Sequence, residues 1–398
     1  MVQYLIIGNG VAGSTAAENI RKNDNKGKIT IVTDEDSAFY HRIRLNEFIS
    51  GDIGEDDLLA KKPSWYNDNN IDLRLNTLIT GADPYKKAVV TDKGENIAYD
   101  KLLMATGSHS FIPPIKGALK QGVFAVRNIS DARNIMSYAG HLKDVVIIGG
   151  GLLGLEAGNA FRKMGKNVTV VEFFPRLLPR QLDLDGAKRL QAIMEGMGFS
   201  FRLDTKTEEI EDKDVVSAVR LAGGEILDAQ MVVISAGVRP NMELAEPLGL
   251  ETDKGIKVNE RMLTNKADIY AAGDVAEFNG MPYGIWPAAM DQGKIAGLNM
   301  AGTDAVYPGT TMANTLKVVG IDLASAGDID ADNKYESKTV SDENTYKKIV
   351  LDNKRIIGCI MLGDTKAFNK ITKLMAAETD ISAVKDEILK EGFDFSSI

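Results

Sequence analysis

The chain has 398 residues, of which 44% are hydrophobic and 26% charged, so it is long enough to bury substantial cores in two or three domains. Its formal net charge of −9 argues against nonspecific nucleic-acid binding, which normally needs a basic surface. The apolar runs are too short to span a membrane, and the first residues lack the features of a signal peptide. We therefore expect a cytoplasmic protein that binds neither membranes nor nucleic acid.

Cysteine and histidine are scarce in this sequence. The chain contains one cysteine, Cys359, and three scattered histidines, His41, His109 and His141. One cysteine cannot form a disulfide within the chain, and the histidines lack the spacing of metal ligands, so we predict no metal site. Cys359 lies in the apolar run IIGCIML, and we expect its thiol to be buried in a strand.

Strand, glycine turn, helix and strand follow one another twice along the chain. Residues 3–7 predict a buried strand, 11–22 a helix and 28–33 a second strand, before a charged meander over 71–100 and a strand that begins at 101. The same order returns over 144–172, and 231–237 predict a further strand of this second unit. Alternation of this kind is typical of parallel sheets covered by helices.

The last third of the chain has a different sequence pattern. Residues 267–302 end in a helix rich in small residues and are expected to rejoin the first unit. From about 305, short strand-like segments precede helices near 366–377 and 383–391. We predict an α/β protein with two Rossmann-type domains and a small C-terminal α+β domain. The predicted domains cover 1–112 with 240–304, then 113–239, then 305–398.

The first glycine turn, Gly8-Asn9-Gly10-Val11-Ala12-Gly13, lies between a predicted strand and a predicted helix. In such a turn Gly8 allows the tight bend, Gly10 lets a pyrophosphate approach the backbone, and Gly13 permits close helix–strand packing. The helix N-terminus then offers free N–H groups to the phosphates. The next strand ends at Asp34 and Glu35, where a carboxylate can bind ribose hydroxyls, so the sequence predicts a dinucleotide site.

The second glycine turn, Gly149-Gly150-Gly151-Leu152-Leu153-Gly154, has the same surroundings, and its partner strand ends at Glu172. A carboxylate there accepts hydrogen bonds from a ribose 2′-hydroxyl and repels a 2′-phosphate, which favours NADH over NADPH. Arg176 lies near enough in sequence to leave some NADPH use open. Two dinucleotide sites predict two dinucleotides, and the economical pair is a flavin that stays bound and a nicotinamide that exchanges.

Taken together, these motifs resemble those of the pyridine nucleotide-dependent flavoprotein reductases of the glutathione reductase-like fold. The resemblance covers roughly residues 1–302, and it rests on the two glycine turns and on three further motifs, Ala105-Thr106-Gly107, Ala236-Gly237 with Arg239-Pro240-Asn241, and Ile269-Tyr270-Ala271-Ala272-Gly273-Asp274. It implies tightly bound FAD in the first domain and NADH in the second. The residues that it places at FAD are Gly8, Gly10, Gly13, Asp34, Glu35, Arg42, Ile79, Ala105, Thr106, Gly107, Gly273, Asp274 and Pro287. Those that it places at NADH are Gly149, Gly151, Leu152, Leu153, Gly154, Glu156, Glu172 and Gly237.

Within this family the segment Phe39–Glu47 is similar to the branch of rubredoxin reductases and nitrite reductase flavoproteins, in which an arginine at the position of Arg42 contacts the FAD diphosphate. Members that reduce disulfides or peroxides carry a redox-active cysteine in this region, and this chain has none there. Many relatives have a lysine close to the flavin where this chain has Glu47. The resemblance also places Glu156 beside the nicotinamide. It directs the first turn of the helix after Trp286 and Pro287 toward the flavin. It singles out no side chain as a certain catalytic acid or base.

The resemblance implies an oxidoreductase of electron transport that moves hydride from NADH to FAD and then gives single electrons to a small acceptor protein, with rubredoxin the best fit. An exposed basic helix face, formed by Lys366, Lys370 and Lys373, is a candidate docking surface for an acidic acceptor, although such faces are more often simply solvated. Two alternatives stay open. One is a flavoprotein subunit of a larger, nitrite reductase-like complex, and the other is an NADH-sensing flavoprotein resembling apoptosis-inducing factor.

Overall fold

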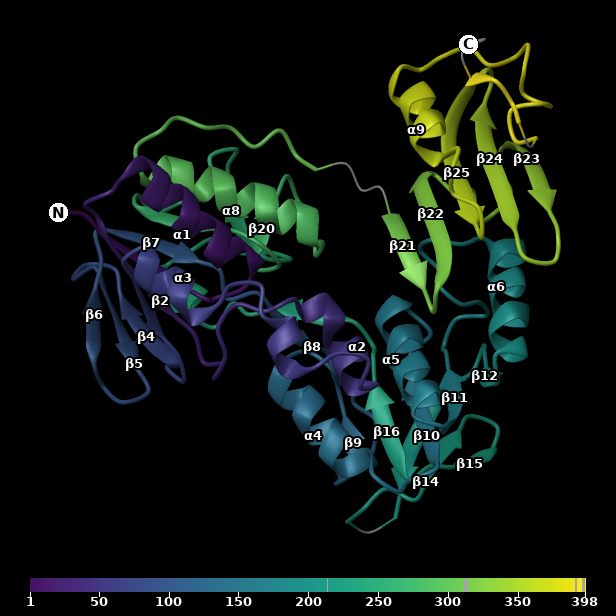
Figure 1. Ribbon diagram of the computed structural model, residues 1–398, viewed down its shortest axis with the longest axis horizontal. Helices are drawn as coiled ribbons and strands as arrows, with labels where there is room; N and C mark the ends of the chain where they lie inside the picture. The colour runs from purple at the N-terminus through teal and green to yellow at the C-terminus, as the bar shows by residue number, and fades with distance from the viewer. Residues whose placement is uncertain (213, 311–313, 391, 396–397) are drawn as a thin grey trace. The chain divides into compact units, whose positions relative to one another are not determined.

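The computed structural model describes residues 1–212, 214–310, 314–390, 392–395 and 398. The chain divides into two compact units (Figure 1). Unit 1 comprises residues 1–45, 53–109 and 238–311, and unit 2 comprises residues 46–52, 110–237 and 312–398. Within the described part of the chain, no helix is both long and apolar enough to cross a lipid bilayer.

Unit 1 is built on a parallel sheet with the strand order β19-β7-β1-β2-β3. Its elements are β1 (Gln3–Ile7), α1 (Val11–Asn23), β2 (Lys28–Val32), α3 (Pro63–Asp68), β3 (Ile71–Arg74), β4 (Ile79–Asp83), β5 (Ala88–Thr91), β6 (Asn96–Ala98), β7 (Lys101–Met104), β8 (Ser108–Ser110), β17 (Val238–Pro240), α7 (Ala245–Leu248), β18 (Ile256–Val258), β19 (Ile269–Ala271), β20 (Ala276–Phe278) and α8 (Trp286–Met300). β19 and α8 come from the last part of this unit, so the chain returns to the first sheet as predicted.

The sheet of unit 1 is covered on both faces because its strands are apolar on both sides. Tyr4 and Ile6 pack with α1 and α8 in one core, whereas Leu5 and Ile7 pack in another core with the antiparallel meander β4-β5-β6. The helices α1 and α8 lie side by side (Figure 1). Two glycines of α8, at 293 and 297, face the α1 backbone so closely that a Cβ atom at either position would collide with it.

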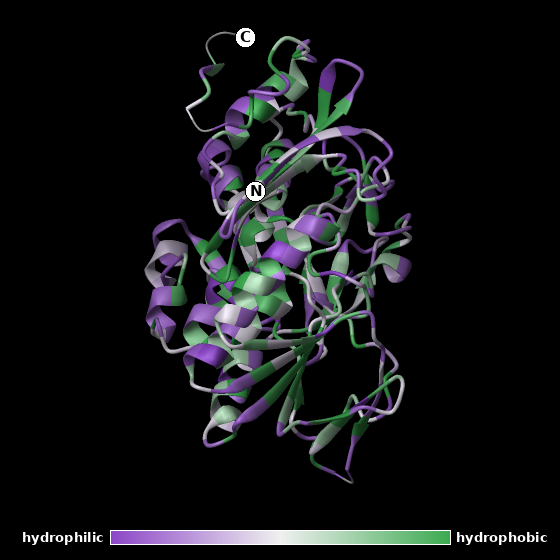
Figure 2. Cartoon of the chain, turned by 90° about the vertical axis from the view of Figure 1, so that its right-hand side faces the viewer, coloured by the Kyte–Doolittle hydropathy of each residue, from purple (hydrophilic) through white to green (hydrophobic). Residues whose placement is uncertain are grey.

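Unit 2 repeats the arrangement with the parallel sheet β12-β11-β10-β16-β9. Its elements up to residue 237 are β9 (Val123–Phe124), α4 (Ile129–Ala139), β10 (Asp144–Ile148), α5 (Leu152–Lys163), β11 (Asn167–Val171), α6 (Leu184–Gly196), β12 (Phe199–Arg202), β13 (Thr207–Glu211), β14 (Ala218–Leu221), β15 (Ile226–Asp228) and β16 (Met231–Ile234), and most of the short helix α2 (Leu45–Ile49) also belongs to unit 2. The sheet β13-β14-β15 packs against the parallel sheet in one hydrophobic core. Figure 2 shows hydrophobic and hydrophilic bands along the helices, as expected where one helix face is buried.

The C-terminal part of unit 2 is an antiparallel sheet with the order β21-β22-β25-β24-β23, which shares a core with α9. The elements are β21 (Asn314–Val318), β22 (Ile321–Gly327), β23 (Glu336–Ser341), β24 (Tyr346–Asp352), β25 (Arg355–Leu362) and α9 (Phe368–Ala376). The predicted α/β fold class with a C-terminal α+β region is therefore confirmed. The predicted domain boundaries stay a prediction, since the division into two units does not test them.

Some elements near the C-terminus differ from the prediction. The helix expected near 366–377 begins only at Phe368, and Lys366 and Ala367 lie before its first turn. The helix expected near 383–391 is wrong for residues 383–390, because 383–389 form successive turns and 390 a bend, and residue 391 lies outside the described residues. Two strands, β22 and β23, were not predicted. The small residues of β22 and the polar residues of β23 carry little of the alternation by which strands are recognised.

Candidate functional site: two glycine turns

The first glycine turn joins β1 to α1 at the carboxyl end of the parallel sheet, where open α/β sheets bind their ligands. Gly8 has φ +110°, and a Cβ atom there would collide with the carbonyl oxygen of Ala105. A Cβ atom at Gly13 would collide with the carbonyl oxygen of Gly8. Gly10 differs, because a Cβ atom there would meet no atom within 4 Å. Two glycines are thus required by packing, and the third borders open space at the N-terminus of α1.

Asn9 gives the first turn a donor that is available to a ligand. Its Oδ1 accepts hydrogen bonds from Ser14 at 3.2 Å and from the hydroxyl of Tyr66 at 3.0 Å. Its Nδ2 is buried and has no hydrogen-bond partner among the residues that the structure describes. Buried donors are normally satisfied, so this atom, next to the open space at Gly10, fits a bound group that supplies an acceptor.

The acidic end of β2 is organised by a short aromatic and basic segment. Glu35 accepts hydrogen bonds from Arg42 at 2.6 Å and from the Tyr40 hydroxyl at 2.5 Å, whereas Asp34 is exposed. Burial opposes the charge of the Arg42 guanidinium, but Tyr40, Glu35 and Asp274 together raise the pKa of Arg42 above its ordinary value. The structure therefore brings Glu35, Arg42 and Asp274 into one electrostatic neighbourhood.

The other residues that the resemblance places at FAD lie mainly at the carboxyl ends of β7 and β19. Thr106 exchanges two hydrogen bonds of 2.8 Å with Asn241, and Asp274 accepts one of 2.8 Å from Ser108. Gly273 donates its N–H to Gln292 on α8 at 2.9 Å. Gly107 and Gly273 both have positive φ angles and Ala105 is buried, while Ile79 is buried in the core beneath the meander. The core that contains Ile79 also contains Ile7 and Val32, the last residues of β1 and β2.

The N-terminus of α8 is held by an aromatic stack that the sequence reasoning did not resolve. The ring of Trp286 stacks on Phe39 at a centroid distance of 5.8 Å and on His41 at 5.6 Å. Pro287 lies in the first turn of the same helix. Tyr66 supports the other side of this segment, since its hydroxyl accepts a hydrogen bond from the Phe39 N–H at 3.1 Å. The stack fixes the residues on either side of Arg42 relative to α8.

The second glycine turn repeats these steric relations. Gly149 has φ +117° and faces the carbonyl oxygen of Ser235, Gly154 faces that of Gly149, and Gly151 again borders open space. Glu172 is 7% exposed and accepts hydrogen bonds from the N–H groups of Gly150 at 2.5 Å and Phe174 at 2.9 Å. The carboxylate at the end of β11 therefore lies directly against the glycine turn.

The remaining residues predicted at NADH surround this turn within unit 2. Leu152 is partly buried and Leu153 is 51% exposed in the first turn of α5, and Gly237 has φ +97°. Glu156 follows on α5, and its Oε1 accepts the N–H of Val319 at 2.7 Å. Burial raises the pKa of Glu156, with a smaller contribution from the nearby Glu47. The Val319 contact could not be foreseen, because it joins segments 163 residues apart.

Cys359 lies in the core of the C-terminal sheet. It is 0% exposed in β25, and burial raises the pKa of its thiol to about 12. A thiol of this kind is a poor nucleophile and redox group near neutral pH, because the thiolate is the reactive form. The buried strand position expected for Cys359 is confirmed.

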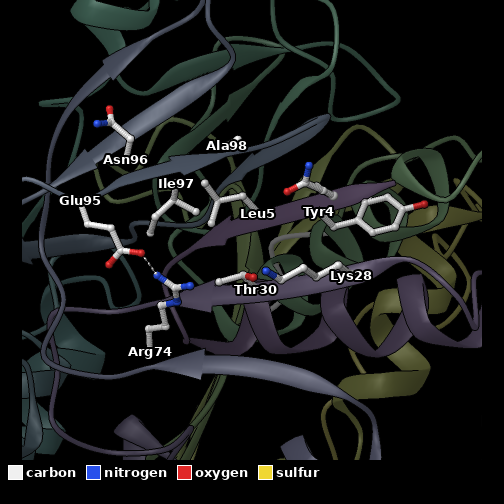
Figure 3. A pocket seen from close by; sticks show the side chains of 10 residues that line it. Tyr4, Leu5, Lys28, Thr30, Arg74, Glu95, Asn96, Ile97 and Ala98 are labelled. Atoms are coloured by element: carbon white, nitrogen blue, oxygen red, sulfur yellow. Dashed lines mark hydrogen bonds and ion pairs between the residues drawn. The ribbon is translucent and has the colours of Figure 1, made fainter. Parts of the chain in front are cut away.

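Unit 1 also contains a polar cavity of about 260 Å³ (Figure 3). It is lined by Gln3, Tyr4, Leu5, Lys28, Thr30, Arg74, Glu95, Asn96, Ile97 and Ala98. Arg74, the cation drawn beside Glu95, is already paired with that carboxylate at 2.7 Å and with Asp72 at 3.1 Å. The lining includes residues of β1, β2, β3 and β6 and none of the residues that the resemblance places at FAD.

Comparison with known proteins identifies the class. The model of the pyridine nucleotide-disulphide oxidoreductase family matches residues 2–293, and that of the rubredoxin NAD⁺ reductase C-terminal domain matches residues 313–379. The chain belongs to the pyridine nucleotide-disulphide oxidoreductase family. This assignment confirms the family predicted from the motifs and implies FAD and NADH as the cofactors.

Particular relatives refine this placement. The chain is 37% identical over 384 residues to a nitrite reductase [NAD(P)H] of Bacillus subtilis, which covers 96% of this chain and 48% of that protein. It is 33% identical over 372 residues to an NADH-rubredoxin oxidoreductase of Clostridium acetobutylicum, with 93% of both proteins covered. A crystal structure of NADH:rubredoxin oxidoreductase from the same organism superposes with a TM-score of 0.86 and 32% identity, over 97% of this chain and 98% of that one. The chain spans about half the length of the first curated relatives it matches, which are nitrite and nitrate reductase proteins.

Proposed function

We propose that this chain is an NADH-dependent flavoprotein reductase that passes electrons to a small one-electron acceptor protein, with rubredoxin the first candidate. The observation that carries the proposal is the pair of glycine turns, one in each unit, each with two glycines packed against backbone carbonyl oxygens and one glycine facing open space. Support for the acceptor comes from the relative of similar length, an NADH-rubredoxin oxidoreductase that this chain covers to 93%.

The residues of unit 1 fit FAD. Open space at Gly10, the unpaired donor of Asn9 and the N-terminus of α1 suit a pyrophosphate, and Glu35 and Arg42 suit a ribose and a diphosphate. When bound, FAD supplies the ability to take two electrons from NADH and release them one at a time, which no side chain here can do. The protein's part is to bind, orient and shield the two nucleotides.

The second site suits NADH better than NADPH. Glu172 is buried against the glycine turn, so a 2′-phosphate placed there would meet a desolvated negative charge. The nearest candidate to neutralise that phosphate, Arg176, donates instead to the carbonyl oxygens of Leu182 and Pro179, both at 3.1 Å. Phe173 and Phe174 follow Glu172 and are 65% and 50% exposed, which leaves an apolar surface beside the ribose position.

The lack of a reactive thiol separates this chain from a disulfide reductase. Its single cysteine is buried in the C-terminal sheet, so within these 398 residues no thiol pair can relay electrons. Electrons must therefore pass from the flavin to the acceptor without a sulfur relay in this chain.

We propose that the acceptor docks on basic residues of the C-terminal region. Lys366, Lys370 and Lys373 are exposed, although only the last two lie on α9. Phe368 and Ile371 occupy the buried face of that helix, while the Lys370 ammonium lies 4.9 Å from the centre of the Phe395 ring. Reversing the three charges is expected to slow electron transfer to an acidic carrier at low salt and to leave NADH-driven dye reduction unchanged. Equal loss of both activities would exclude a docking role.

A second candidate is supported by the length of the relatives. The first curated relatives are nitrite and nitrate reductase proteins about twice as long as the matched region, so this chain also suits the flavoprotein part of a larger, nitrite reductase-like complex. The chemistry of this chain is the same in both cases, and only the acceptor differs.

The deciding experiment is anaerobic stopped-flow mixing of NADH-reduced protein with rubredoxin, ferredoxin and nitrite in parallel. The protein is expected to be yellow, to bleach with one equivalent of NADH, and to be reoxidised much faster by rubredoxin than by nitrite. Material that contains FAD and is not bleached by NADH would refute the reductase. Bleaching followed by reoxidation with none of the three would refute rubredoxin as the acceptor and leave the flavoprotein intact.

A further inference from the structure

The hairpin β21–β22 ends in a strained two-residue turn. Val318 pairs with Ile321, and the connecting residues Val319 and Gly320 have φ angles of +54° and +85°. Positive φ at both central residues defines the tight hairpin turn that asparagine and glycine normally occupy. A β-branched valine at the first position is a clear outlier, and outliers of this kind persist where surrounding structure holds them.

The N–H of Val319 is directed at a carboxylate of the second nucleotide-binding fold. In a two-residue turn this N–H makes no bond within the hairpin, and Val319 is only 5% exposed, so a partner is required. That partner is Oε1 of Glu156 at 2.7 Å. Glu156 lies on α5, two residues beyond the last glycine of the second glycine turn.

The other charges around Glu156 are few. Glu47 of α2 faces it with like charge, and Lys163 of α5 acts in the opposite sense. Lys163 is itself paired with Asp52 at 2.6 Å, which divides its attraction between two carboxylates. The Val319 N–H is therefore the hydrogen-bond donor that fixes one oxygen of Glu156, while Glu47 and Lys163 set its electrostatic surroundings.

A buried polar network holds the same C-terminal sheet against the second fold. Asp183 caps α6 by accepting the Gly186 N–H at 2.9 Å. Its other oxygen accepts hydrogen bonds from the Tyr346 hydroxyl at 2.7 Å and from Lys348 at 2.9 Å, both from β24. Lys348 is 2% exposed and also donates to the carbonyl oxygens of Ile329 and Asp330. We call Asp183, Tyr346 and Lys348 the sheet anchor.

We propose that the Val319–Gly320 turn is a positioning element of the nicotinamide site, whose N–H holds the Glu156 carboxylate in place while the sheet anchor holds the turn. The proposal rests on the proposed function in taking the second glycine turn as the NADH site. It gives the C-terminal region a role in the NADH half of the reaction, in addition to any role in acceptor docking. The strain at Val319 then has a reason, because that backbone conformation directs the N–H at Glu156.

The contact can be tested without any turnover by amide hydrogen exchange of peptides that cover residues 317–323. Glu156→Ala is expected to speed exchange at Val319 at least tenfold, because the buried amide loses its acceptor. Glu156→Gln keeps an acceptor oxygen and should retain most of the protection. Glu195→Ala, which removes an exposed carboxylate from α6, serves as the matched control and should match the unmodified protein. Equal exchange at Val319 in Glu156→Ala and the unmodified protein would overturn the proposal.

The positioning role predicts a change in the pH dependence of NADH use, which a purely structural role would not produce. Tyr346→Phe weakens the sheet anchor mildly and Lys348→Met strongly, and neither residue lies on α5. If the turn loosens, Glu156 loses its donor and its pKa rises. In this proposal the ionised Glu156 sets the acidic limb of the kcat/KM profile for NADH, so that limb should move to higher pH. Anchor variants that lose thermal stability but keep the profile would refute positioning. A protein that NADH does not bleach would refute the proposed function alone, since the exchange experiment is independent of it.

Discussion

Replacing Lys348 with methionine should destabilise unit 2 while leaving unit 1 unaffected. The side chain is 2% exposed, and the change would leave the buried Asp183 carboxylate without its cation. Removing one member of a buried ion pair costs about 3–5 kcal/mol. Asp183 would keep its hydrogen bonds from Tyr346 and Gly186, so we expect the lower end, about 3 kcal/mol.

The neighbouring pair provides the control. Lys347 bonds Asp364 at 2.6 Å, but the two side chains are 15% and 33% exposed, so Lys347→Met should cost about 1 kcal/mol or less. Urea unfolding can separate the two units, because both tryptophans, Trp65 and Trp286, lie in unit 1. The loss should therefore appear in the far-ultraviolet circular dichroism transition and not in tryptophan fluorescence. Equal destabilisation by the two methionine variants would show that the buried Lys348–Asp183 pair contributes no more to stability than the partly exposed Lys347–Asp364 pair.

Three further outcomes are expected. Gly10→Ala should fold with the same urea midpoint as the unmodified protein, since its Cβ atom meets only open space, and should bind FAD at least tenfold more weakly. Gly8→Ala should fail to fold. Normal FAD binding by Gly10→Ala would contradict the assignment of the first turn to FAD. Glu172→Ala should lower kcat/KM for NADH about tenfold and for NADPH much less, and an equal loss for both would exclude ribose recognition. Cys359, with its pKa raised by burial to about 12, should react with iodoacetamide at pH 8 only after unfolding, because thiolate forms as pH rises toward that pKa; rapid labelling of the folded protein would disprove its burial.

Much of this molecule could be predicted because its main constraints are local. Gly8 and Gly149 must accept positive φ angles, and Gly13 and Gly154 must accept close contact with the carbonyl oxygens of Gly8 and Gly149, so each turn is marked by glycines only a few positions apart. The acidic residues Glu35 and Glu172 follow from where the second strand of each repeat ends. Such signals survive without any knowledge of long-range packing.

The residues that were missed depend on contacts between distant segments. Tyr66 bonds Asn9 across 57 positions, and Val319 bonds Glu156 across 163. No periodicity in the sequence marks such partners. The segment 383–390 illustrates the opposite error, since a helix-like pattern there does not form a regular helix.

The packing of α8 on α1 has a consequence for how the protein is made. The edge strand β19 and the helix α8 are encoded some 250 residues after α1, so the first sheet stays incomplete until residue 271, and α1 lacks its partner helix until residue 300, has been synthesised. At typical translation rates of about 5–20 residues per second, the apolar face of α1 waits about 15–60 seconds for its partner. During this interval the intervening nucleotide-binding fold can already form, so we expect flavin capture to be the later event on the ribosome, and the exposed α1 surface to be the part of the nascent chain most in need of a chaperone.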